Sequence, residues 1–167
     1  GKLVGLCTSF VVMTGQLSAG VPVSAIVEID PQGNMVAIWE ESCQSGVVIK
    51  ASNRTFAGAA WSTPHQLSLT DSNSENLSSR GPQLAINASG EAVAIWVSTD
   101  PTSLNDGIYA ATISLQGSAN WTAATAVSEA NETIRPMGMR YSVKLNANNQ
   151  AIVLWQTSTY NYMCSTS

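Results

Sequence analysis

Charged side chains are scarce in this chain of 167 residues. Asp, Glu, Lys and Arg make up 11% of the sequence and the formal net charge is −4, whereas soluble domains usually carry about 25% charged residues. The seven Lys and Arg residues are dispersed along the chain. Nucleic acids and anionic membranes bind through basic patches that neutralise phosphate. The composition therefore argues against both as partners.

Histidine and cysteine are nearly absent as well. His65 is the single histidine, and no second histidine or cysteine stands at ligand spacing from it. This argues against a metal site and against a histidine-based triad. Cys7, Cys43 and Cys164 form no Cys-x-x-Cys pattern. Cys43 and Cys164 could pair in an oxidising compartment if Cys7 left with a signal peptide, but unpaired thiols are favoured because the two fall at different places of the repeat described below. We expect no metal and no cofactor.

A long apolar run is also missing, and residues 1–22 fit two interpretations. A basic residue followed by the apolar residues 3–13 is typical of a secretory signal, and the run is too short to span a membrane. Alternatively, residues 10–18 form the last strand of a preceding repeat. They share with residues 61–68 and 121–128 an aromatic residue about one strand ahead of a closing serine.

What the sequence does contain is one stretch that occurs three times. Residues 29–39, 86–96 and 145–155 each show a turn rich in Asp, Asn and Gly, then four apolar residues, then a tryptophan. The three tryptophans stand 57 (96 − 39) and 59 (155 − 96) residues apart. This period is in or just above the range that is typical of propellers and solenoids.

Each repeat predicts four antiparallel strands. The first strand leads into the turn, where Gly, Asn and Asp tolerate the positive φ that a tight hairpin needs, and the second strand ends at the tryptophan. A polar loop, a third strand and a fourth strand follow. The first strands are expected at residues 23–29, 82–86 and 141–145, the polar loops at 40–45 and 97–106, the third strands at 46–51, 107–113 and 160–165, and the fourth strands open at Trp61 and Trp121.

Four strands in roughly 57 residues is the size of one propeller blade. The apolar runs 92–95 and 151–154 do not alternate with polar residues, as expected where neighbouring blades cover both faces of a sheet. Trp39, Trp96 and Trp155 are interpreted as buried wedges between blades, since they recur in every copy. The predicted fold class is all-β, a partial β-propeller of four-stranded antiparallel blades with about two and three-quarter repeats.

The repeats divide the chain into blade 1 at residues 23–68, blade 2 at 82–128 and an incomplete blade 3 at 139–165. Propellers typically close with four to eight blades, so either the chain is a fragment whose ring is completed by further blades, or several chains assemble one ring. The fragment is favoured, because the third repeat stops within its blade. An open ring exposes the apolar faces of its end blades, and we expect the isolated chain to self-associate.

The repeat resembles the units of large bacterial propeller proteins, whose blades are loosely similar to those of the sialidase-like superfamily. The resemblance rests on the Asn/Asp-x-x-Gly turn, the Ala-Val-Ala-Ile-Trp strand and the Gly-Ile-Tyr-Ala-Ala strand, and it spans residues 23–165. The Ser-x-Asp-x-Gly-x-Thr-Trp box of that superfamily is absent before Trp61 and Trp121. The resemblance implies a blade architecture and leaves the activity open.

Sialidase-like chemistry would require arginines that grip a carboxylate together with a tyrosine nucleophile. Arg80 and Arg140 precede first strands at nearly equivalent places, and Tyr141 opens one. These three are the candidate ligand-binding residues. The acids are scattered through loops rich in Ser, Thr and Asn, where solvated charges are the common case, so no catalytic residue is assigned.

Two classes of function remain. The first, which is favoured, is a non-catalytic binding or scaffold module of an exported or surface-associated bacterial protein, extracellular or in the cell envelope. Its loops at residues 69–81, 98–106 and 129–138 would contact a glycan or a protein, because loops on a rigid scaffold often carry recognition. The second is part of a sialidase-like glycan-processing enzyme or an oligomerising glycan-binding lectin.

Overall fold

The computed structural model of the chain describes residues 22–43, 46–55, 60–70, 77–99, 105–117, 119–129, 134, 141–157 and 162–166. Both interpretations of the N-terminal segment concern residues outside these ranges, apart from Pro22, which begins a strand. The described residues form strands and no helix. Accordingly, none of their segments is a helix with the length and hydropathy that crossing a membrane requires.

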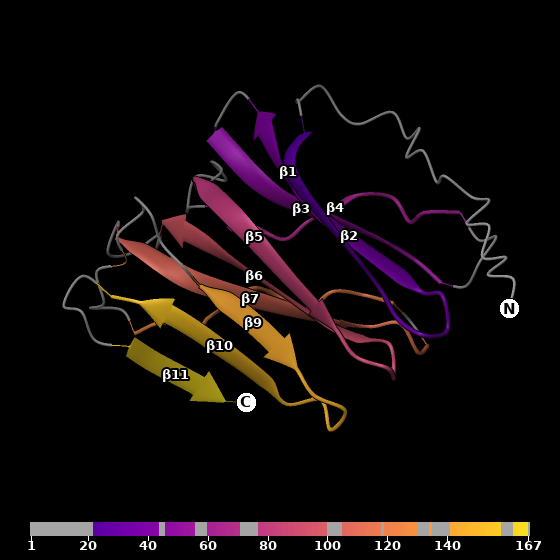
Figure 1. Ribbon diagram of the computed structural model, residues 1–167. Coiled ribbons are helices and arrows are strands. Elements are labelled where there is room, and N and C mark those ends of the chain that lie inside the picture. The colour runs from indigo at the N-terminus through magenta and orange to yellow at the C-terminus, as the bar shows by residue number, and fades with distance from the viewer. Residues whose placement is uncertain are drawn as a thin grey trace, which may run out of the picture.

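Eleven strands in the described ranges form three antiparallel sheets, which lie side by side in Figure 1. Each sheet follows the order of the chain, β1-β2-β3-β4, β5-β6-β7-β8 and β9-β10-β11. The predicted all-β class is confirmed, and the sheets are called blades 1, 2 and 3 below. The strands are β1 (Pro22–Ile29), β2 (Met35–Cys43), β3 (Gly46–Arg54), β4 (His65–Gln66), β5 (Ser79–Ile86), β6 (Glu91–Thr99), β7 (Asp106–Ser114), β8 (Thr125–Ala126), β9 (Ser142–Leu145), β10 (Ala151–Gln156) and β11 (Tyr162–Thr166).

The turn between the first and second strands of each blade is built on one Asp or Asn side chain. Its Oδ1 accepts hydrogen bonds from the backbone N–H groups two and four positions later, at 2.8–3.1 Å. These residues are Asp30, Asn87 and Asn146. The residue three positions later has the positive φ that was expected: +87° at Gly33, +77° at Gly90 and +63° at Asn149. The repeated turn sequence thus fixes the register of each hairpin.

The second strands do not end at their tryptophans, so the polar loops predicted at residues 40–45 and 97–106 are wrong at residues 40–43, 97–99 and 106, which lie in strands. β2 continues to Cys43 and β6 to Thr99, and both pair with the third strand along their whole length. Two of the third strands are also longer than expected, because β3 continues to Arg54 and β7 spans Asp106–Ser114. The polar side chains within residues 40–43 and 97–99 resemble loop residues in the sequence. Their place in a strand depends on pairing with β3 and β7, which the local sequence does not show.

Glu41 shows how the extension of β2 accommodates a charge. Its carboxylate is almost completely buried, and Lys50 Nζ on β3 lies 2.6 Å from Glu41 Oε1. Trp39 Nε1 donates to Glu41 Oε2 at 3.3 Å. A buried carboxylate is tolerated where cations and donors surround it.

The fourth strands are shorter than predicted, with two residues each, and they begin four residues after Trp61 and Trp121 (65 − 61 and 125 − 121). The predicted opening at the tryptophans is therefore wrong. Directly after each tryptophan, a side-chain hydroxyl accepts a hydrogen bond from a backbone N–H group of the third strand, in place of a backbone carbonyl of the fourth strand. Asn53 N donates to Ser62 Oγ at 3.0 Å, and Thr112 N donates to Thr122 Oγ1 at 2.9 Å. Such side-chain bonds compete with regular pairing.

Every blade has two different faces, because side chains alternate along its second strand. In β6, Val93 and Ile95 belong to the cluster shared with blade 3, whereas Ala94 and Trp96 belong to the cluster shared with blade 1. We call these the forward and backward faces. The repeat tryptophans lie at the same place of each backward face, and they are buried, as the repeat alignment predicts. Their exposed fractions are 2% for Trp39, 0% for Trp96 and 4% for Trp155.

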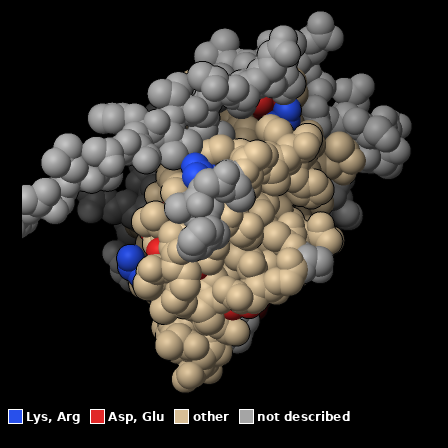
Figure 2. Space-filling view, turned by 90° about the vertical axis from the view of Figure 1, so that its right-hand side faces the viewer, with Lys and Arg blue, Asp and Glu red and all other residues tan. Residues whose placement is uncertain are grey.

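The outermost faces carry exposed apolar side chains. On β1, Val27 and Ile29 are 53% and 58% exposed, and on β10, Ile152 and Leu154 are 44% and 48% exposed. Ile152 and Leu154 occupy the forward-face positions that Val93 and Ile95 occupy in blade 2. Charged side chains are few on the face drawn in Figure 2, and most of its described surface is uncharged.

Candidate functional site

Two of the three candidate ligand-binding residues lie together where the three blades meet. Arg80 is on β5, and Tyr141 directly precedes β9. The third, Arg140, lies outside the described residues. β5 packs against both β1 and β9, so the first strands of the blades are neighbours. This position makes the surroundings of Arg80 and Tyr141 the natural place to look for a site.

The contacts there link one residue of each blade. The Tyr141 hydroxyl of blade 3 donates to the carbonyl oxygens of Gly81 and, at 3.3 Å, Arg80. Gly81 N of blade 2 donates to Glu40 Oε1 of blade 1 at 2.7 Å. Arg80 Nη2 lies 2.5 Å from Asp106 Oδ2 on β7. We call Glu40, Arg80, Gly81, Asp106 and Tyr141 the inter-blade cluster.

Glycine is required at position 81 for two reasons. Its φ of +64° is unfavourable for residues with a Cβ. A Cβ built there would also overlap the Tyr141 hydroxyl. The same place in blade 1 is held by Ser24 (81 − 57), which also has a positive φ, +52°, and both positions lie at a shift in strand register. The positive φ and the register shift therefore occur in blades 1 and 2 alike. In blade 2 the missing Cβ of Gly81 also leaves room for the Tyr141 hydroxyl.

The phenol of Tyr141 is held in its protonated form. The pKa of Tyr141 is raised to about 12, mainly by burial and further by the negative charge of Glu40, while the positive charge of Arg80 lowers it. At neutral pH the hydroxyl is therefore a hydrogen-bond donor. A tyrosine nucleophile needs the opposite arrangement, with a base that removes its proton.

A Tyr141→Phe variant tests this assignment through the alkaline titration of the protein. In the parent chain one of the four tyrosines should form its phenolate near pH 12, and this step should be missing from the variant in ultraviolet difference spectra. Since the pKa of Tyr141 in the folded protein lies above the ordinary tyrosine value of 10.0, the stabilisation that Tyr141 contributes is complete below pH 10 and is lost as the pH rises towards 12. The difference in unfolding free energy between parent and variant should shrink over that window. A Tyr141 that titrates near pH 10 would contradict the buried, donating phenol.

Arg80 is likewise occupied within the fold. Its partner Asp106 begins β7, and Asp106 Oδ1 also accepts from Thr99 Oγ1 at 3.4 Å. Arg80 on β5 thus pairs with an acid of the same blade. A guanidinium that grips a ligand carboxylate needs its paired N–H donors available, whereas one N–H group of Arg80 is already taken.

Sequence reasoning missed Glu40, which it placed in a loop. The signal was a mismatch between repeats, since position 40 corresponds to Val97 (40 + 57) and Gln156 (97 + 59). A carboxylate therefore occurs at this place in blade 1 alone. Such a departure marks a contact that belongs to one blade, here the bond to Gly81.

The other predicted residues lie apart from the inter-blade cluster. Trp61 and Trp121 are half-buried, and Trp121 packs against the core between blades 1 and 2. His65 is exposed on β4. Cys43 is an exposed thiol that donates to the carbonyl oxygen of Gly46 at 3.1 Å. Among the described residues, no group of three or more His, Cys, Asp or Glu side chains could hold a metal ion.

The comparisons with known proteins bear on the fold. The sequence matches no family model, and no curated protein matches it. Among solved structures, the chain is similar to an endo-arabinase from Bacteroides thetaiotaomicron, with 12% identity and a TM-score of 0.51 over 91% of this chain. The fold is that of a partial β-propeller. The chain spans 57% of the length of that endo-arabinase chain.

Proposed function

We propose that this chain is a non-catalytic binding or scaffold module, a set of propeller blades in an exported or surface-associated bacterial protein. The observation that carries the proposal is the state of the inter-blade cluster. Tyr141 donates to backbone carbonyls, Glu40 accepts from Gly81, and Arg80 pairs with Asp106. The polar groups that converge between the blades thus bind one another, and their contribution is to hold three blades in a fixed arrangement.

Recognition would then fall to the loops between blades. Propeller loops extend from a rigid sheet scaffold, and scaffolds of this kind often carry binding residues in such loops. Within the proposed loops at residues 69–81, 98–106 and 129–138, residues 79–81, 98–99 and 106 belong to strands β5, β6 and β7, and residues 71–76, 100–104, 130–133 and 135–138 lie outside the described part of the chain. Their abundance of Ser, Thr and Asn suits hydrogen bonding to the hydroxyl groups of a glycan or to a polar protein surface.

A second candidate is part of a glycan-processing enzyme, favoured by the likeness to the endo-arabinase. Glycoside hydrolysis usually needs two facing carboxyl groups, about 5–9.5 Å apart, with one pKa raised. The inter-blade cluster contains Glu40 from blade 1 and Asp106 from blade 2, and each is already bound to a group of the protein.

One panel of glycans separates these two candidates. The purified chain should bind one or more glycans or surface proteins on an array, and it should hydrolyse arabinan and aryl glycosides no faster than buffer does. The matched variants are Glu40→Gln, which removes the charge in the inter-blade cluster, and Glu28→Gln on β1 as a control. Turnover that Glu40→Gln abolishes and Glu28→Gln preserves would overturn the proposal and support the glycosidase. If the chain neither binds nor hydrolyses any member of the panel, the binding role is contradicted, and of the two proposed roles the scaffold role remains.

A further inference from the structure

Glu40 and Tyr141 bind the same short piece of backbone in blade 2. Glu40 Oε1 of blade 1 accepts a hydrogen bond from Gly81 N at 2.7 Å. The Tyr141 hydroxyl of blade 3 donates to the carbonyl oxygen of Gly81 and, at 3.3 Å, to that of Arg80. The Arg80 carbonyl and the Gly81 N–H group are the two ends of one peptide group. Blades 1 and 3 therefore bind opposite ends of the same peptide group.

The strand ladder does not fix the orientation of this peptide group. The pairing of β5 with β6 shifts register between Arg80 and Gln83, and Pro82 has no N–H group to donate. In a regular strand, successive carbonyl groups point to opposite sides, whereas those of Arg80 and Gly81 both bind one hydroxyl. Glycine adopts positive and negative φ about equally well. The orientation of the Arg80–Gly81 peptide group therefore depends on the side chains that bind it.

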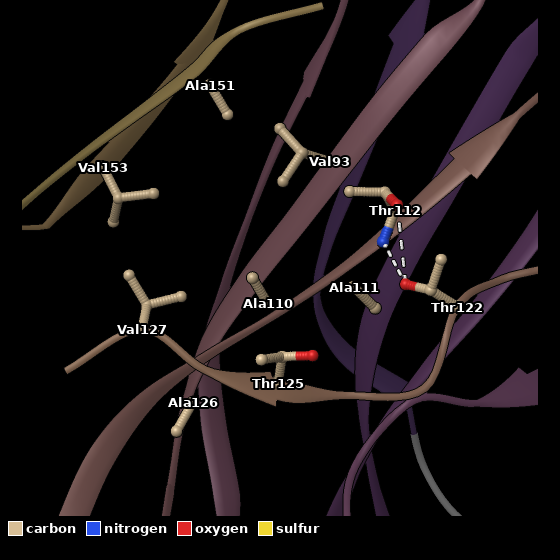
Figure 3. Close-up of a pocket in the computed structure, with 10 residues that line it drawn as sticks. All are labelled: Val93, Ala110, Ala111, Thr112, Thr122, Thr125, Ala126, Val127, Ala151 and Val153. Atoms are coloured by element: carbon tan, nitrogen blue, oxygen red, sulfur yellow. Dashed lines mark hydrogen bonds between the residues drawn. The ribbon is translucent and has the colours of Figure 1, made fainter. Parts of the chain in front are cut away.

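Apolar contacts between blades 2 and 3 do not set this orientation either. Figure 3 shows the residues that line a pocket of about 460 Å³ between the two blades. Aliphatic side chains from both blades contribute to its walls, namely Val93, Ala110, Val127, Ala151 and Val153. Apolar contacts are non-directional, so they hold blades together without fixing the direction of a peptide group. The hydrogen bonds at Gly81 supply that direction.

The arrangement is specific to blade 2, because the repeats do not reproduce its partners. Ser24 has the place of Gly81 in blade 1 (81 − 57), also with a positive φ at a register shift. The residue of blade 2 at the place of Tyr141 is Pro82 (141 − 59), which has no hydroxyl to donate to that backbone. The residue of blade 2 at the place of Glu40 is Val97, which has no acceptor.

The two contacts strengthen each other. The C–N bond of a peptide group has partial double-bond character, so its N–H and C=O groups are polarised together. A carboxylate that accepts from Gly81 N makes the Arg80 carbonyl oxygen more negative, and hence a better acceptor for the Tyr141 hydroxyl. Chains of hydrogen bonds inside proteins are cooperative for this reason.

We propose that the Arg80–Gly81 peptide group is a coupling element through which Glu40 of blade 1 and Tyr141 of blade 3 act on each other. Loss of either contact frees the peptide group to turn, and the remaining contact weakens. Energetic coupling needs an element with two arrangements that both sites bias, and the orientation of this peptide group is that element. Glu40 and Tyr141 are its positioning residues. The coupling needs no ligand, so the proposal is independent of the proposed function.

A double-mutant cycle in urea unfolding tests the coupling. Tyr141→Phe removes only the hydroxyl, and Glu40→Val introduces the residue that blade 2 has at this place. The unfolding equilibrium constant of the double variant should be at least about fivefold smaller than the product of the two single effects predicts. The control cycle combines Tyr141→Phe with Glu28→Val on β1, and its effects should multiply within about twofold. Multiplicative effects in the Glu40 cycle would overturn the proposal.

Amide hydrogen exchange followed by NMR locates the coupling in the backbone. Tyr141→Phe leaves Glu40 in place, yet the Gly81 amide should exchange at least about tenfold faster than in the parent. The control amide is that of Gly90 beyond the other end of β5, which donates to the carbonyl oxygen of Asn87 at 3.1 Å, and its rate should change by less than about twofold. Unchanged exchange at Gly81 would refute the coupling. Equal acceleration at Gly81 and Gly90 would refute it as well, because it would mean a general loosening of blade 2.

Discussion

Replacing Lys50 by methionine should lower the free energy of unfolding by about 3–5 kcal/mol, the usual loss when one partner of a buried ion pair is removed. Glu41 has a side chain that is 3% exposed, and Lys50 Nζ lies 2.6 Å from its Oε1. Without Lys50 the buried carboxylate loses the ammonium group that lies 2.6 Å from it. The measurement is urea unfolding at neutral pH, followed by far-ultraviolet circular dichroism.

Two further variants decide whether the loss comes from the carboxylate of Glu41, which stays buried when Lys50 is removed. The second repeat has Ser98 and Tyr109 at the places of Glu41 and Lys50, so a Glu41→Ser/Lys50→Tyr double variant gives blade 1 the uncharged pair of blade 2. It should recover most of the stability lost in Lys50→Met, because no carboxylate remains buried. Lys144→Met on β9, where the side chain is exposed, should cost less than about 1 kcal/mol. A Lys50→Met variant as stable as Lys144→Met would rule out this role for the pair.

The sequence was most informative where structure is decided locally. The hairpin turns were predictable because one Asp or Asn side chain and one residue of positive φ fix them within five residues. The burial of Trp39, Trp96 and Trp155 followed from their recurrence at matched positions. The all-β class needed only these features and the absence of helical periodicity.

Errors arose where a residue depends on a distant partner. Glu40 and Glu41 look like loop residues beside the polar positions that follow them, and only the neighbouring strand shows that they belong to β2. The fourth strands were predicted too long because a serine or threonine hydroxyl takes the place of a ladder partner after Trp61 and Trp121. A polar side chain that replaces a strand partner does not change the hydrophobic periodicity of the sequence, so the periodicity could not predict where these strands begin.

The inter-blade cluster was harder to predict, for a reason inherent in repeats. Glu40, Gly81 and Tyr141 come from three blades and from three different places within the blade. A search for matched positions in successive repeats paired Arg80 with Arg140 and passed over Glu40. Contacts between unlike positions become visible only once the blades are placed side by side.

The Trp96→Ala variant should lose about 3–5 kcal/mol of unfolding free energy, the usual cost of removing a buried large aromatic side chain. Trp96 is 0% exposed and lies in the cluster that joins blades 1 and 2. Its loss would leave a cavity between two sheets, and the surrounding β-branched side chains can collapse into it only in part. Urea unfolding monitored by circular dichroism measures the loss without relying on tryptophan fluorescence.

The position of Trp96 between two blades makes the outcome more specific than a loss of stability. Since the indole packs blade 2 against blade 1, its removal should expose amides of β2 and β6 to hydrogen exchange while the Asn87 turn, bonded to Asn146 at 2.9 Å, stays protected with blade 3. Trp96→Phe keeps part of the contact area and should lose less unfolding free energy than Trp96→Ala. Trp61→Ala, at a half-buried position, should lose less than either of them. If Trp96→Ala cost under about 1 kcal/mol, the ring would have to be exposed in solution, and its role as a wedge between blades would be wrong. A loss spread evenly over all three blades would instead mean that they unfold as one unit, because the inter-blade contacts then outweigh the stability of any single sheet.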